Sequence, residues 1–112
     1  MEIEDAVVAL SALAHANRLA AFRLLVEAGP QGLNCTELGG RLGLAPATLS
    51  FHLAQLARAG LVTSRQQSRF IFYAANFARM DEVLAYLTDD CCGGQDCLPR
   101  VASARRRAAR CT

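Results

Sequence analysis

The fold is decided by one stretch near the middle of the chain, 46-PATLSFHLAQLARAG-60. Leucines recur at positions 49, 53 and 56, which is the spacing of one face of an α-helix. Pro46 suits the first position of a helix, and Gly60 suits its end. We therefore predict a short amphipathic helix whose other side presents Ala47, Thr48, Phe51 and Gln55, with Ser50 and His52 on its flanks.

Helical spacing also marks the chain before this stretch. Apolar residues recur from Ile3 to Ala14, and Asn17 is placed to cap a second helix that ends at Gly29-Pro30. A short third helix is predicted from Thr36 to a closing glycine at 43, and a brief turn separates it from Pro46. The middle of the chain is therefore predicted to contain two short helices joined by a tight turn.

The period of the pattern changes after Gly60. Two segments rich in β-branched and aromatic residues, Leu61–Arg65 and Arg69–Tyr73, flank a polar triplet and predict a β-hairpin. Asn76 is predicted to cap a last helix that runs to about Asp90. The complete pattern predicts a mainly α fold with a β-hairpin wing, the winged helix-turn-helix.

In a winged helix-turn-helix the second helix of the pair lies in the major groove of DNA, and the hairpin contacts the backbone or the minor groove. Short hydroxyl and amide side chains suit base edges and phosphates, whereas arginines beside a wing tip suit phosphates. The predicted DNA contacts are Thr48, Ser50, Phe51, His52, Gln55, Arg65 and Arg69. The alternative is that these are ordinary solvated residues of a helical domain.

Composition narrows the class of protein. A chain of 112 residues forms a single domain, and a hydrophobic content of 53% indicates a globular chain with apolar surface to bury in a subunit interface. The net charge of +2 is too small to indicate nucleic-acid binding by itself. No apolar run approaches the roughly 18 residues of a membrane span, and the first five residues are acidic rather than basic. We therefore expect a cytoplasmic protein, with no membrane partner, whose thiols are reduced.

Three of the five cysteines lie in the string 91-CCGGQDC-97. Adjacent cysteines make a poor disulfide, but both sulfurs can reach one external atom, and the two glycines allow the chain to return Cys97 as a third ligand. Three sulfurs without a nearby histidine suit a thiophilic centre such as trivalent arsenic or antimony better than a closed tetrahedral zinc site. Cys91, Cys92 and Cys97 are therefore the predicted metalloid ligands, while Cys35 and Cys111 are predicted bystanders. A chance cluster at a helix end is the alternative.

Three segments closely resemble the ArsR/SmtB family of metal-responsive repressors: 13-LAHANRL-19, the stretch from Thr36-Glu37-Leu38 to 42-LGL-44, and 48-TLSFHLAQL-56 with 59-AGLV-62. The resemblance covers roughly residues 5 to 90. It implies a homodimer, joined through the first and last helices, that binds an inverted-repeat operator and is released by its inducer. The cysteines beyond the last helix resemble the site of an arsenic-responsive subgroup. Phe51 departs from the polar residue of many members, and the wing lacks their usual glycine.

From residues and resemblance together we expect a DNA-binding and dimerisation domain at 1–90, a metalloid-binding segment at 91–97 and an Arg-rich tail at 98–112. The expected function is an arsenic-responsive repressor without a permanent cofactor, induced by As(III) or Sb(III), and by methylarsenite if two thiols suffice. A redox switch that joins Cys92 to Cys97 or links subunits, and a Cd or Pb sensor, remain alternatives. An enzyme is disfavoured because the chain has no C-x-x-C and its thiols follow a helix C-terminus.

Overall fold

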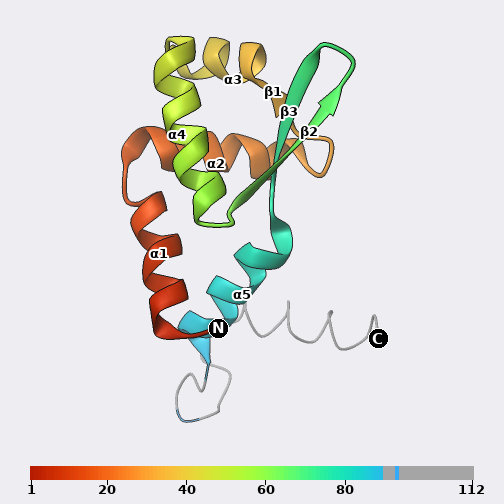
Figure 1. Ribbon diagram of the computed structural model, residues 1–112. Helices are drawn as coiled ribbons and strands as arrows, with labels where there is room; N and C mark the ends of the chain where they lie inside the picture. Colours follow the sequence, from red (N-terminus) through yellow and green to blue (C-terminus); the bar gives the residue numbers. More distant parts are fainter. Residues whose placement is uncertain (90–92, 94–112) are drawn as a thin grey trace.

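Five helices and a small antiparallel sheet, which lies to one side of them, make up the computed structural model of the protein, which describes residues 1–89 and 93 (Figure 1). The elements follow the order α1 (Ile3–Leu13), α2 (Ala16–Ala28), β1 (Leu33–Asn34), α3 (Cys35–Leu42), α4 (Pro46–Arg58), β2 (Val62–Gln67), β3 (Phe70–Ala75) and α5 (Phe77–Thr88). The predicted winged helix-turn-helix is confirmed. The predicted segments 91–97 and 98–112 lie outside the described residues, apart from Gly93.

Two helix starts differ from the predictions. α2 is capped by His15 rather than Asn17, because the imidazole Nδ1 of His15 accepts a hydrogen bond from the backbone N–H of Asn17 at 3.2 Å. α3 begins one residue before Thr36, since the side chain of Asn34 accepts from the N–H of Glu37 at 2.8 Å and forms a capping box with it. The predicted starts at Pro46 and after Asn76 are confirmed.

The sheet contains a strand that the sequence did not indicate. β1 pairs with β3, so the strand order is β1-β3-β2, and Leu33 lies opposite Tyr73. The hairpin strands are also longer than predicted, and their turn holds Ser68 at φ 59°, in the left-handed region. The wing is therefore the outer part of a three-stranded sheet whose first strand directly precedes α3.

Leucines from α2, α3, α4 and the start of the wing fill the core. The largest fully buried side chains are Leu25, Leu38, Leu49, Leu53, Leu56 and Leu61. The leucines of α4 are thus buried, as predicted from their spacing, and this burial turns the opposite side of α4 to the surface.

None of the helices in the described part of the chain has the length and apolar character of a membrane span, since the longest have 13 residues.

The two terminal helices leave large apolar side chains outside the core. α1 packs inward through three alanines, Ala6, Ala9 and Ala12, whereas Val7 is 55% exposed. We use the name α1/α5 apolar surface for the large apolar side chains that are exposed on these two helices and at the residue before α1. They are Met1, Ile3, Val7, Val8, Leu10, Leu84 and Leu87. Figure 1 shows α1 and α5 at one end of the molecule, with α3 and the wing tip at the other.

Candidate nucleic-acid interface

The turn between α3 and α4 sets the direction of the exposed face of α4. Gly43 ends α3 in the left-handed conformation, at φ 67°, and its N–H donates to the carbonyl of Gly39 at 2.8 Å. Pro46 then starts α4, and no side chain caps this helix at Ala45. The first N–H groups of α4 therefore lack the side-chain acceptor that a Ser or Asp would supply, and a phosphate oxygen is a suitable substitute.

Most of the residues predicted to contact DNA from α4 lie at the surface. Thr48, Ser50 and Phe51 are exposed, and Gln55 is half-buried. Gln55 also lines a shallow depression of about 300 Å³ between α1 and α4, together with Val7, Val8, Ser11, Ala12, Arg18, Arg58 and Ala59. α4 thus presents hydroxyl, amide and aromatic groups, and it has no charged side chain before Arg58.

The wing contributes the positive charge. Arg65 in β2 and Arg69 in the hairpin turn are both exposed, as a phosphate contact requires. The guanidinium carbon of Arg65 lies 5.1 Å from the centre of the Phe72 ring, which is a cation–π distance. Phe72 lies opposite Arg65 in the ladder, so cross-strand pairing holds one of the two arginines in place.

His52 lies elsewhere than predicted. Its side chain is only 5% exposed, and its Nδ1 accepts a hydrogen bond from Nε of Arg18 at 3.3 Å. The rings of His15 and His52 are 4.7 Å apart. Desolvation lowers the pKa of His52, and the charges of His15 and Arg18 lower it further. Its burial leaves His52 little surface for the predicted DNA contact, and its imidazole instead joins α4 to α2.

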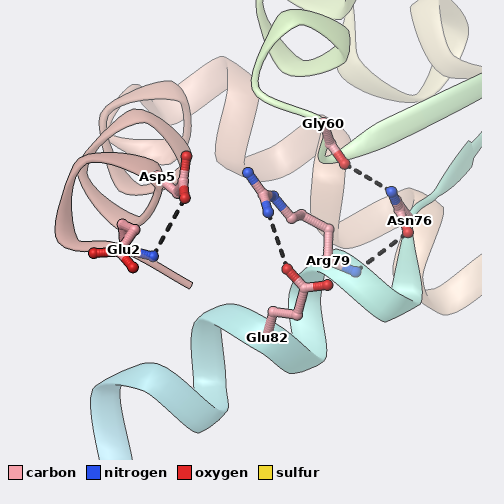
Figure 2. A network of polar contacts seen from close by, with 6 residues as sticks. All are labelled: Glu2, Asp5, Gly60, Asn76, Arg79 and Glu82. Carbon is pink, nitrogen blue, oxygen red and sulfur yellow. Dashed lines mark hydrogen bonds and ion pairs between the residues drawn. The ribbon is translucent and has the colours of Figure 1, made fainter.

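A polar network joins α5 to the end of α4 (Figure 2). The side-chain amide of Asn76 donates to the carbonyl of Gly60 at 2.9 Å, and its oxygen accepts from the N–H of Arg79 at 3.2 Å. Arg79 also pairs with Glu82 at 2.9 Å. The sequence indicated Asn76 as a helix cap, but no signal in it pointed to the bond with Gly60, which lies 16 residues away.

The predicted ligands Cys91, Cys92 and Cys97 lie outside the described residues, as does Cys111. Cys35, the predicted bystander, is the first residue of α3 and is partly buried. Burial raises the pKa of the Cys35 thiol, which favours its neutral form. In residues 1–89 and 93, no three side chains of His, Cys, Asp or Glu come together in a group that could hold a metal ion.

Known proteins share both this sequence and this fold. The family described as "Helix-turn-helix domain" matches residues 13–65, from the end of α1 into β2. The transcriptional activator HlyU of Vibrio cholerae is 35% identical over 82 residues, which is 73% of each chain. The chain belongs to the ArsR family of transcriptional regulators. The resemblance seen in the sequence is thereby confirmed at the level of the family.

Solved structures of ArsR-type regulators repeat the architecture. HlyU from Vibrio cholerae superposes with a TM-score of 0.60 at 38% identity, covering 78% of this chain and 97% of HlyU. The transcriptional repressor BigR from Xylella fastidiosa gives 0.62 at 29% identity, covering 80% and 89% of the two chains. An ArsR-like regulator from Rhodococcus sp. RHA1 gives 0.65 over 96% and 90%, and at 24% identity it shows the fold alone. These relatives are regulators of transcription, which are not enzymes.

Proposed function

We propose that this ArsR-family regulator is an arsenic-responsive repressor. In this proposal a homodimer binds an inverted-repeat operator, and As(III) or Sb(III) releases it by binding Cys91, Cys92 and Cys97. The observation that carries the DNA-binding part is the exposed side of α4, with Thr48, Ser50 and Phe51, next to a wing with two exposed arginines. A helix of this kind fits the major groove, and a cationic hairpin fits the flanking phosphates.

The α1/α5 apolar surface supports the dimer. Monomeric soluble proteins rarely expose contiguous apolar patches of more than a few hundred Å², and larger patches are typical of subunit interfaces. α1 and α5 pack against each other, and α1 leaves four large aliphatic side chains exposed and α5 two. A two-fold contact through this surface would give a dimer with two copies of α4, which is what an operator with two half-sites about one DNA turn apart requires.

The position and chemistry of the cysteines support the inducer. Cys91 follows the end of α5 by three residues, so the thiols adjoin a helix of the proposed interface. Arsenous acid reacts with three thiol groups, each of which gives its proton to a departing hydroxyl group, so three As–S bonds replace three As–O bonds and three waters leave with no net release of protons. The acidic residues around the cysteines oppose formation of the free thiolates that a divalent cation needs. The reaction with arsenite starts from neutral thiols, so these acidic residues disfavour arsenite binding much less. Ligand and DNA binding would then be coupled, typically by ~1 to 3 kcal/mol.

Fluorescence anisotropy of a labelled duplex, selected by the protein from a random pool, tests this function. Arsenite and antimonite are expected to release the duplex, and Cys91→Ser is expected to prevent release. Cys111→Ser serves as the matched control and should release normally, because it removes a thiol outside the proposed site. Binding that arsenite leaves unchanged, or normal release of the Cys91→Ser protein, would contradict the proposal. Methylarsenite, Cd(II), Pb(II) and Zn(II) in the same titration define the selectivity of the site.

A redox switch is the second candidate, and one observation favours it. A structure of HlyU from Vibrio cholerae, 37% identical to this chain, is described as "Reduced HlyU", so a reduced form of that relative has been distinguished. In this protein, two thiols such as Cys92 and Cys97 would form a disulfide while peroxide is reduced to two waters. Release by peroxide without release by arsenite, abolished in Cys92→Ser, would select this candidate.

A further inference from the structure

Phe51 is the largest apolar side chain exposed on α4. It is 55% exposed, whereas the leucines at 49, 53 and 56 on the same helix are buried. It lies one turn after Thr48 and one turn before Gln55, in the middle of the side that faces away from the core. The centre of its ring lies 5.7 Å from that of the neighbouring His52, in a T-shaped arrangement. Phe51 therefore occupies the centre of the surface that the proposed function places against base edges.

The rest of this surface lacks the charged groups that most often read guanine and cytosine, and the hydroxyl groups of Thr48 and Ser50 do not select one base. From Pro46 to Ala57 the helix has no Arg, Lys, Asp or Glu. Arg and Lys are the usual partners of guanine in the major groove, and Asp and Glu accept from cytosine. Gln55 suits adenine, but it is half-buried beside α1. The exposed surface is thus mostly apolar or weakly polar, and the apolar group that base pairs present in the major groove is the C5-methyl of thymine.

We propose that Phe51 is a specificity-determining residue whose ring packs on the C5-methyl group of one thymine in each half-site. The inference rests on the proposed function, because it requires α4 to enter the major groove. It assigns the operator a thymine at the centre of the α4 footprint. Burying a methyl group contributes a factor of roughly four in affinity at each half-site, or roughly fifteen for a symmetric dimer.

The test replaces thymine by deoxyuridine, which removes this methyl group and leaves the hydrogen-bonding groups of the base pair unchanged. Symmetric pairs of thymines in a selected duplex are substituted one position at a time, and dissociation constants are measured by fluorescence anisotropy. At one position the substitution is expected to weaken binding by the wild-type protein roughly fifteen-fold. The Phe51→Ala protein should bind the thymine and uracil duplexes equally well at that position.

Two further variants make the result specific. Phe70→Ala removes a comparably exposed aromatic ring, 45% exposed, from the wing rather than from α4, and it should keep the full uracil effect. Phe51→Leu keeps an apolar group, so it should keep part of the effect even if Phe51→Ala binds too weakly to measure. Both substitutions at position 51 are at the surface, and unchanged thermal unfolding would show that the fold is intact.

The outcomes separate this inference from the function on which it rests. Failure of the wild-type protein to bind any selected duplex would overturn the proposed function. Tight binding with no thymine position sensitive to uracil would overturn the inference alone, as would an equal uracil effect in the wild-type and Phe51→Leu and Phe51→Ala proteins. Either of the last two results would mean that Phe51 does not read a thymine methyl group, and a contact with another protein would then be the alternative role of its exposed ring.

Discussion

Removing the charge of the wing should weaken DNA binding in a way that depends steeply on salt. Arg65 and Arg69 are exposed, and in residues 1–89 and 93 neither forms an ion pair. Each arginine that neutralises a phosphate releases condensed counterions, which contributes about 0.9 to the slope of log K against log salt. The Arg65→Gln/Arg69→Gln double variant removes four charges from a dimer, so the slope should become shallower by about 3.6.

The expected change in affinity follows from this slope. Over a four-fold change in salt, from about 50 to 200 mM, the affinity ratio of wild type to double variant should fall about 150-fold. Arg69→Gln alone removes two charges and should give about a 12-fold fall. Arg65→Gln has a second effect, because Arg65 also stacks on Phe72.

Anisotropy titrations with one duplex at several salt concentrations measure the slopes. Arg23→Gln is the matched control for Arg69→Gln, since each removes one charge per subunit, but the guanidinium of Arg23 already pairs with Glu27 at 3.2 Å. This variant should keep the wild-type slope. If Arg69→Gln and Arg23→Gln lower the slope equally, the overall charge and not the wing directs binding, and the assignment of the wing to phosphates fails.

Three other predictions concern stability and assembly. Folding lowers the pKa of His52 below its ordinary value of 6.5, so on acidification the unfolded chain takes up a proton before the folded chain does. The free energy of unfolding, measured by chemical denaturation, should therefore fall as the pH drops below about 6.5, and it should fall less in His52→Asn. Gly32→Ala should lower the free energy of unfolding by about 3 kcal/mol or more in thermal melts, because Gly32 has φ +72° and a Cβ would overlap the Tyr73 carbonyl. The control Gly40→Ala places a Cβ in open space on α3, so it should be neutral or stabilising by up to about 1 kcal/mol. Leu84→Glu, in the α1/α5 apolar surface, should weaken dimerisation roughly a hundredfold in sedimentation equilibrium, because it buries an unpaired charge. The control Leu19→Glu alters an exposed leucine of α2 and should leave dimerisation unchanged, and a Leu84→Glu protein that dimerises as well as this control would place the interface elsewhere.

The elements that could be predicted from sequence are those whose signals are local. The spacing of leucines in α4 and the cap at Asn76 concern neighbouring residues, and both agree with the structure. β1 was missed because a two-residue strand has no periodicity of its own and exists through its pairing with Tyr73 and Phe72. The turn of the wing was hard to locate because Ser68 adopts a conformation that usually indicates glycine or asparagine.

The same distinction applies to the candidate interface. Thr48 and Phe51 lie opposite the buried leucines and Ser50 lies on a flank, and helical spacing alone indicated that all three are outside the buried stripe. His52 lies at the flank of that stripe, and its burial depends on Arg18 and His15, which α2 and its cap bring against it. In α1, spacing identified the large aliphatic residues but not the face that packs inward, because three alanines fill the small space against the core.

The pairing of β1 with β3 has a mechanical consequence. Asn34 is both the last residue of β1, opposite Phe72 of the wing, and the cap of α3. A hydrogen bond from the side-chain amide of Asn76, the cap of α5, to the carbonyl of Gly60 joins the base of the hairpin to α5. Since the wing is hydrogen-bonded both along β3 and at its base, we expect it to move together with the α3–α4 pair. In the proposed dimer, each subunit should therefore bind DNA as one rigid unit. An inducer bound beyond α5 would then change the angle between the two subunits rather than the shape of either one.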